Sequence, residues 1–139
     1  MLGGISGHAG LFSNSYEVAI VLQSMIQKGK YDNLTLFSDE SFDKFNFCYF
    51  CENDNRSGVG FDKPQIEGKH GSTFGGVSKD SFGHYGYTGS MAWADPDKNI
   101  IFIFLSNRTY PTRENTLLQT SNTRTRSQEI VYKSLIDSE

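Results

Sequence analysis

The sequence predicts an α+β fold, in which helices flank an antiparallel sheet of three to four strands. One observation behind this prediction is an apolar stripe with helical spacing in the first third of the chain. Another is a series of short apolar runs over residues 81–107, which turn residues separate. Eleven Phe and seven Tyr among 139 residues also favour a sheet, because aromatic side chains suit strands.

Length and charge restrict what the chain can be. A chain of 139 residues has the size of one domain. Its net charge of -3 and pI of about 5.6 argue against nucleic acid or an anionic membrane as the main partner. No apolar run reaches the ~18 residues that a membrane span needs, and residues 1–4 lack the features of a signal peptide. We therefore expect no nucleic-acid partner and no membrane span.

The N-terminal part predicts a loop followed by a helix. Four glycines in the first ten residues predict an irregular entry loop, where we interpret His8 as a packed or capping residue. A helix is expected over about 15–28. Asn14 and Glu17 approximate its capping box, with Ser13 as an alternative N-cap. Its apolar stripe consists of Val18, Val21, Leu22, Met25 and Ile26.

The next segments predict one helix, two loops and a strand. A short helix is expected within 36–45, because Ser38 can cap it and acidic residues follow in its first turn. Residues 46–57 predict a polar loop. Residues 58–62 predict a short strand, which a lysine-proline pair ends. Residues 65–80 predict a surface loop, because they carry little periodicity.

Three further strands are expected over 81–87, 90–95 and 100–107. A hairpin turn joins the last two, with Pro96 preset for its second position. The run from 100 to 105 is apolar on both faces, which is typical of a central strand that helices or loops cover.

The C-terminal part predicts a polar loop over 106–126 and an amphipathic helix over 127–136 that packs on the sheet. The loop is either a solvated segment or an anion-facing rim near a site. Both interpretations rest on its four arginines, which are Arg108, Arg113, Arg124 and Arg126.

Cys48 and Cys51 form a Cys-x-x-Cys pattern, which suits half a zinc site or a redox pair. A zinc site needs about four ligands, and only His70 or His84 is at hand to complete one. The Tyr-Phe spacer is poor for a redox motif. We therefore interpret the cysteines as a structural or incidental pair, with metal and redox roles as the alternatives, and expect no metal and no cofactor.

His84 is the leading candidate for catalysis. It can transfer a proton or donate a hydrogen bond, and neighbouring glycines bring backbone N–H groups close to whatever binds beside it. Ser41 and Lys44 match Ser-x-x-Lys formally. We interpret these two residues as the solvated start of a short helix, because so short a pattern arises easily by chance.

Three stretches resemble the serine beta-lactamase-related hydrolases, whose fold is that of the penicillin-binding proteins. They are residues 3–13 with the helix to Gly29, residues 84–89, which resemble the third active-site motif, and residues 104–115. The last stretch is similar to the modules found C-terminal to family 3 beta-N-acetylglucosaminidases. The resemblance covers nearly the whole chain and implies an incomplete beta-lactamase/transpeptidase-like fold.

The resemblance implies a site in which a serine of Ser-x-x-Lys is acylated with help from Tyr-x-Asn. His84 stands where the family has Lys or His, close to the nucleophile or to the substrate carboxylate. The backbone around Tyr87 and Thr88 would face the acyl group. Tyr85 replaces the commoner Thr or Ser, which weakens the case for recognition of a beta-lactam carboxylate. The substrate-binding residues implied are Tyr85, Gly86, Tyr87, Thr88, Gly89 and Arg108.

The first two motifs of the family are expected ahead of Gly3. The chain is therefore expected to be the C-terminal portion of a serine hydrolase domain, inactive alone. Its Gly-rich loop and helical part are expected over 1–57, and its sheet and C-terminal helix over 58–139. Its expected partner is the missing N-terminal half, or a second copy that pairs along the strand at 100–106. The resemblance implies a small amide, ester or peptidoglycan-like substrate and a periplasmic or extracytoplasmic location.

The alternative is a non-catalytic module that binds cell-wall or carbohydrate fragments. Trp93, Tyr85 and Tyr87 would then be its stacking surfaces. We favour ordinary sheet packing for these three aromatic residues.

Overall fold

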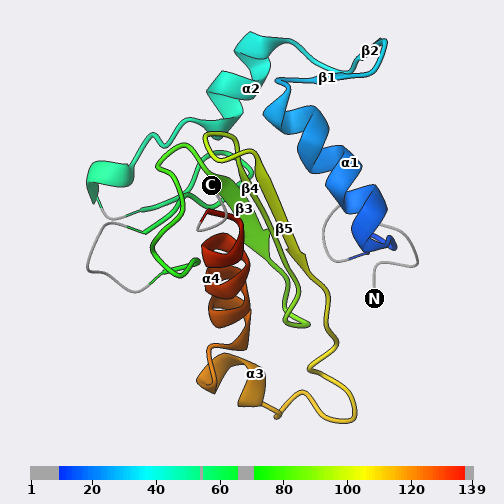
Figure 1. The fold of residues 1–139 in the computed structure, drawn as a ribbon, viewed down its shortest axis with the longest axis vertical. Helices are drawn as coiled ribbons and strands as arrows, with labels where there is room; N and C mark the ends of the chain where they lie inside the picture. Colours follow the sequence, from blue (N-terminus) through cyan, green and yellow to red (C-terminus); the bar gives the residue numbers. More distant parts are fainter. Residues whose placement is uncertain (1–9, 54, 66–70, 137–139) are drawn as a thin grey trace.

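A computed structural model describes residues 10–53, 55–65 and 71–136 of the chain. Helix α1 covers one face of a three-stranded sheet and helix α4 covers the other (Figure 1). His8 lies outside the described residues. The elements are α1 (Ser15–Ile26), β1 (Lys30–Tyr31), β2 (Leu34–Thr35), α2 (Asp39–Asn46), the 3-10 turn η1 (Cys51–Asn53), β3 (Phe82–Tyr85), β4 (Met91–Asp95), β5 (Ile100–Phe104), α3 (Leu117–Thr120) and α4 (Thr123–Ile136).

The predicted α+β class is confirmed, and the sheet is antiparallel with the strand order β3-β4-β5. Its register pairs Phe82 with Ala94 and Trp93 with Phe102. Among the described residues β4 is the central strand and β5 lies at the edge, so the interpretation of residues 100–105 as a central strand is wrong for this part of the chain. The run is apolar on both faces because α1 lies over one face and the buried residues Ile100 and Phe102 pack on the other.

The two faces of the sheet carry separate clusters, because successive side chains of a strand point to opposite faces. Under α1, Leu22, Phe82 and Ala94 form one buried cluster. Under α4, the buried cluster consists of Met91, Trp93 and Phe102.

Both predicted helix caps of the N-terminal part are present. The backbone N–H of Glu17 donates to Oδ1 of Asn14 over 3.1 Å, so Asn14 rather than Ser13 caps α1. The N–H of Ser41 donates to Oγ of Ser38 over 3.2 Å at the start of α2. Each cap satisfies one N–H that the first helical turn leaves without a partner.

The strand predicted over 58–62 is wrong. The N–H of Gly58 donates to the carbonyl of Phe61 over 2.7 Å, so the segment closes into a tight turn. Only isolated bridges remain, from Asp62 to Ser57 and to Gly83. One of them attaches this turn to the outer edge of β3.

Three further differences concern short or polar elements. The β1–β2 hairpin was not predicted, although Asp32 adopts the positive φ of 51° that such tight turns favour. The polar segment 106–126 contains α3 and the first turn of α4, which begins at Thr123. The N–H of Arg126 donates to the carbonyl of Asn122, so backbone hydrogen bonds form this turn without an apolar stripe to predict it.

Cys48 and Cys51 are joined by a disulfide, with their Cα atoms 5.5 Å apart. The two sulfurs bond to each other, as in a structural pair. Within the described ranges, no group of three or more metal-ligating side chains is found, and no helix is long and apolar enough to cross a membrane.

Candidate functional site

A tight hairpin connects β3 to β4 at the end of the sheet. The N–H of Gly86 donates to the carbonyl of Ser90 over 2.7 Å, and the N–H of Gly89 donates to that of Gly86 over 2.9 Å. Gly89 has a φ of 96°, a value that side-chain-bearing residues rarely adopt. A Cβ at Gly89 would collide with the side chains of Leu118 and Ser106. The hairpin thus needs glycine at this position.

Arg108 holds the hairpin in place. Its backbone N–H donates to the carbonyl of Thr88, and its Nε donates to the carbonyl of Tyr87, each over 2.9 Å. Its guanidinium carbon lies 4.7 Å from the centroid of the Tyr87 ring. Nη1 donates to the carbonyls of Arg113 and Asn115. The side chain of Arg108 therefore positions the hairpin, and a direct contact with substrate stays a prediction.

His84 lies on the same face of the sheet as α1 and is exposed. On that face, α1 covers Phe82 and Ala94. Nδ1 of His84 lies 2.6 Å from the carbonyl oxygen of Tyr85. It borders a hollow of about 160 Å³, whose other walls come from the turn at 57–62. An exposed imidazole with Nδ1 engaged by the backbone can present Nε2 to a bound molecule.

The side chain of Tyr85 points to the opposite face from His84. Its hydroxyl donates to the carbonyl of Ser72, and the guanidinium carbon of Arg124 lies 4.1 Å from the centroid of its ring. Burial raises the pKa of the Tyr85 hydroxyl. The structure thus brings the backbone of Tyr85, and not its side chain, next to His84.

The outer edge of β3 is paired only in part. The N–H of Gly83 donates to the carbonyl of Asp62 over 3.1 Å, and the N–H of Asp62 donates back over 2.8 Å. Backbone groups alternate along an antiparallel strand, so those of Tyr85 point to this same edge. Within the described residues, β4 pairs with the inner edge of β3, and no segment pairs with its outer edge beyond Gly83. An extended segment could therefore add to the edge beside His84.

Two other candidates are not assembled into a site. Lys44 pairs with Glu40 over 2.8 Å, while the hydroxyl of Ser41 lies 2.9 Å from that of Ser38. This arrangement agrees with the interpretation of a solvated helix start. Trp93 is fully buried, so the stacking surface expected of a carbohydrate-binding module loses this aromatic residue.

Sequence reasoning missed two residues that shape the site. Asp62, interpreted as part of a strand, supplies the bridge that limits the open edge of β3. Arg124 belongs to the predicted arginine rim, but it stacks on Tyr85 and donates to the carbonyl of Gly89. No local pattern near Asp62 could have revealed its partner, which lies about twenty residues away in the chain.

Comparisons with known proteins show which family the chain resembles. The family model described as Beta-lactamase matches residues 2–122, which include the whole sheet and the hairpin. A protein of Salmonella enteritidis PT4, provisionally named D-alanyl-D-alanine carboxypeptidase, is 36% identical over 110 residues. A protein of Escherichia coli O157:H7 with the same provisional name is also 36% identical over 110 residues. No solved structure matches the chain.

The match covers 77% of this chain but 24% of each of these relatives, so the chain spans about a quarter of their length. Fold, hairpin and comparisons together define a domain related to the serine hydrolases. The chain belongs to the beta-lactamase family.

Proposed function

We propose that this chain forms one wall of an acyl-serine hydrolase site. The observation that carries the proposal is the exposed His84 beside the open outer edge of β3. His84 would donate a hydrogen bond to the nucleophile or to a substrate carboxylate. The backbone around Tyr87 and Thr88, which Arg108 holds in place, would face the acyl group.

The substrate proposed is a small amide or ester, with a cell-wall peptide as the favoured case. An extended peptide can pair with an open strand edge through main-chain hydrogen bonds, which suits the edge next to Tyr85. The provisional carboxypeptidase names of the relatives support this substrate class. Tyr85 would act through its backbone, because Ser72 and Arg124 already engage its side chain.

The nucleophile would come from a part of the protein other than the described residues. Ser41 is not oriented toward Lys44, so it lacks the adjacent base that activates a serine. The chain alone would then be inactive. We also propose an extracytoplasmic location, which the Cys48–Cys51 disulfide supports because disulfides persist in oxidising compartments.

The partner proposed is a further segment of a longer polypeptide, bound along the edge of β5. This strand is five residues long, apolar and unpaired on its outer edge among the described residues. Such an edge favours pairing with another strand. Light scattering of the 139-residue chain should show self-association. A monodisperse monomer would contradict this part of the proposal.

Labelling with a fluorescent penicillin tests the site. The 139-residue chain should remain unlabelled, whereas a longer polypeptide that supplies a Ser-x-x-Lys segment ahead of it should be labelled and should cleave a D-alanyl-D-alanine peptide. In the longer polypeptide, His84→Ala should lower turnover by roughly 100-fold or more, which is typical of losing a hydrogen-bond donor that stabilises the transition state. Its circular dichroism should be unchanged, because His84 is exposed.

Two outcomes would contradict the proposal. Labelling of the short chain at Ser41 would place the nucleophile within it. Binding of muropeptides by the longer polypeptide, without turnover, would favour a non-catalytic module.

A further inference from the structure

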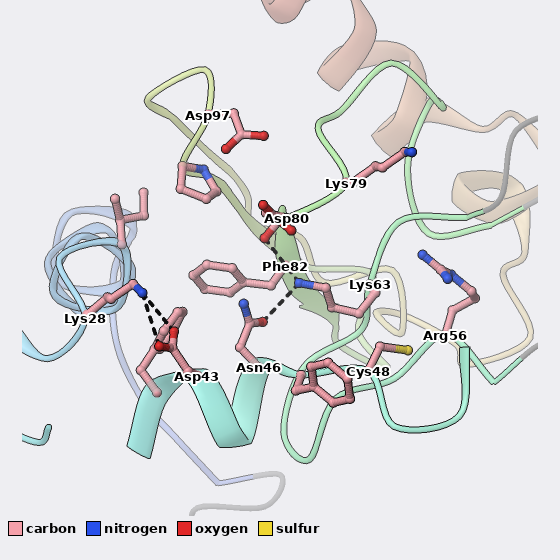
Figure 2. Close-up of a pocket in the computed structure, with 14 residues that line it drawn as sticks. Lys28, Asp43, Asn46, Cys48, Arg56, Lys63, Lys79, Asp80, Phe82 and Asp97 are labelled. Atoms are coloured by element: carbon pink, nitrogen blue, oxygen red, sulfur yellow. Dashed lines mark hydrogen bonds and ion pairs between the residues drawn. The ribbon is translucent and has the colours of Figure 1, made fainter. Parts of the chain in front are cut away.

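A second cavity, of about 590 Å³, lies at the opposite end of β3 from the hairpin (Figure 2). Its walls come from α2, from the first residue of β3 and from the turn after β4, so it is separate from the His84 site. Phe42, Phe47 and Phe82 give it an apolar part. Its volume lies within the range of small-molecule sites, roughly 300–1,000 Å³.

Lys63 is the unusual residue of this cavity. It is only 7% exposed, and its Nζ donates to Oδ1 of Asn46 over 3.2 Å and to the carbonyl of Asp80 over 3.1 Å. Figure 2 shows the ammonium between these two acceptors, and it lies 5.8 Å from the centroid of the Phe82 ring. An ammonium has three N–H donors, so one has no acceptor among the described residues.

Among the described residues, no carboxylate forms an ion pair with Lys63, and Asp80 acts on its charge only from a greater distance. None of the ion pairs among the described residues includes Lys63. Burying an unpaired charge costs several kcal/mol, which neutral acceptors offset only in part. A bound anion would supply both the missing acceptor and the missing charge.

The surrounding charges favour an anion. Arg56 and Lys79 also line the cavity and take part in none of those ion pairs. Arg56 uses Nε to donate to the carbonyl of Pro64 over 2.7 Å, and no hydrogen bond of its Nη atoms is found among the described residues. The lining contains four cationic side chains and three carboxylates. The cations are Lys28, Arg56, Lys63 and Lys79, and the carboxylates are Asp43, Asp80 and Asp97.

Lys63 keeps its charge near neutral pH. Burial lowers the pKa of its ammonium to about 8, while Asp80 acts to raise that pKa and Arg56 to lower it. Of the other cations, Lys28 is already neutralised by Asp43, whose carboxylate lies 2.9 Å from its Nζ. The rest of the lining then holds three cations, Arg56, Lys63 and Lys79, against the two carboxylates of Asp80 and Asp97.

We propose that this cavity binds a small organic anion, whose carboxylate accepts a hydrogen bond from Nζ of Lys63 and whose apolar body packs on Phe42 and Phe82. Arg56 and Lys79 add long-range attraction. The site is independent of His84, so a ligand here leaves the edge of β3 accessible.

Titrating the 139-residue chain with three probes tests the proposal, with amide NMR shifts as the readout at pH 7 and constant ionic strength. Benzoate should bind saturably and shift the amides of Asn46, Asp80 and Phe82. Acetate carries the charge without the ring and should bind roughly tenfold more weakly. Benzyl alcohol carries the ring without the charge and should not saturate. Equal binding of benzyl alcohol and benzoate, or no saturable binding of benzoate, would overturn the proposal.

Variants locate the binding. Lys63→Met should weaken benzoate binding at least about tenfold, and Lys79→Met about threefold, because Lys79 is exposed and acts from a distance. Lys44→Met is the matched control: it removes an exposed lysine of α2 that does not line the cavity, and binding should be unchanged. Wild-type affinity in Lys63→Met would overturn the proposal. If the NMR spectrum of Lys63→Met shows that this variant is unfolded, Lys79→Met provides the test instead. Wild-type affinity of Lys79→Met for benzoate would then overturn the proposal.

Discussion

The two faces of the sheet are stabilised by different physics. Under α1 the contacts are apolar. The centroid of the Phe82 ring lies 5.4 Å from that of the Phe42 ring and 5.1 Å from that of the Phe61 ring. Under α4, polar groups are buried beside the apolar cluster. Asp95, which is fully buried, accepts hydrogen bonds from the hydroxyl of Tyr132 and from backbone N–H groups. One face therefore depends on volume, whereas the other also depends on the hydrogen bonds that buried Asp95 accepts. Nε1 of Trp93 and Nε2 of Gln128 are buried on that second face without a hydrogen-bond partner among the described residues.

The largest effect is expected on the apolar face. Phe82→Ala removes a fully buried ring and leaves a cavity between α1, α2 and the sheet. The free energy of unfolding should fall by about 3–5 kcal/mol, as measured by urea denaturation. Phe12→Ala is the control, since Phe12 is 83% exposed and its loss should change stability by less than about 0.5 kcal/mol. Similar losses for both variants would contradict the location of this cluster.

A smaller loss is expected when the polar face is altered without changing its volume. Asp95→Asn replaces one acceptor oxygen by an amide that faces donors: Ser78 N–H at 2.9 Å and Tyr132 Oη at 3.2 Å. The free energy of unfolding should fall by about 2–3 kcal/mol. Asp97→Asn, in the exposed turn nearby, should change it by less than about 0.5 kcal/mol. If Asp95→Asn were equally neutral, the polar face would not depend on its hydrogen bonds.

A single hydroxyl on the polar face should contribute less again. Tyr85→Phe removes the donor to the carbonyl of Ser72 and should cost about 1 kcal/mol in thermal or chemical unfolding. Tyr87→Phe is the matched control two residues away, because its side chain is 70% exposed. Its stability should equal that of the wild type. An equal loss of stability in Tyr87→Phe would contradict the specific contribution of the hydrogen bond between Tyr85 and Ser72.

The smallest effect concerns Lys63, a charge on the apolar face whose ammonium lies above the Phe82 ring. Its pKa is about 8 in the folded chain, below the ordinary 10.5, so the unfolded chain binds more protons between these values. Stability from Lys63 should therefore rise with pH above about 8, by roughly 1 kcal/mol or less up to pH 9.5.

Comparing urea denaturation at pH 8 and 9.5 between wild type and Lys63→Met isolates this dependence. The measurements stay below pH 10 so that Tyr85 and Tyr132 do not contribute to the pH dependence. Burial raises the pKa values of both tyrosines above their ordinary 10.0. Those tyrosines oppose stability only at higher pH, where the unfolded chain loses their protons first. An identical pH dependence in both chains would show that Lys63 titrates normally.

Much of the fold was predictable because its signals are local. The stripe behind Asn14, the cap at Ser38 and the turn at Pro96 each act within a few residues, and the structure places helices and strands accordingly. The short β1–β2 hairpin also carried a local signal, at Asp32, that was not used.

The burial of Lys63 could not be predicted, because its partners come from two distant segments. Asn46 and Asp80 each lie 17 residues away in the chain. In the sequence, this lysine and the following proline indicate only the end of a strand. The position of β5 at the edge of the sheet was missed for a similar reason. Its apolar pattern indicates that both faces of the strand are covered, but it does not indicate how many strands pair with it.

The sequence placed His84 on a strand over 81–87 but could not assign its neighbours to the two faces of that strand. Strand alternation settles this once the register is known, because Tyr85 then points to α4 and Arg124. The sequence therefore predicts the stretch, and the structure separates the residue that faces outward from the residue that packs.

That opposite orientation has a consequence for how the stretch can change over generations. A substitution at position 85 is judged by the fit to Ser72 and Arg124, whereas one at position 84 is judged by what occupies the open edge of β3. Under the proposed function, position 85 is therefore constrained by stability and position 84 by chemistry. A library that varies position 85 together with Arg124 should keep the proposed activity of His84. A library that varies position 84 should lose that activity.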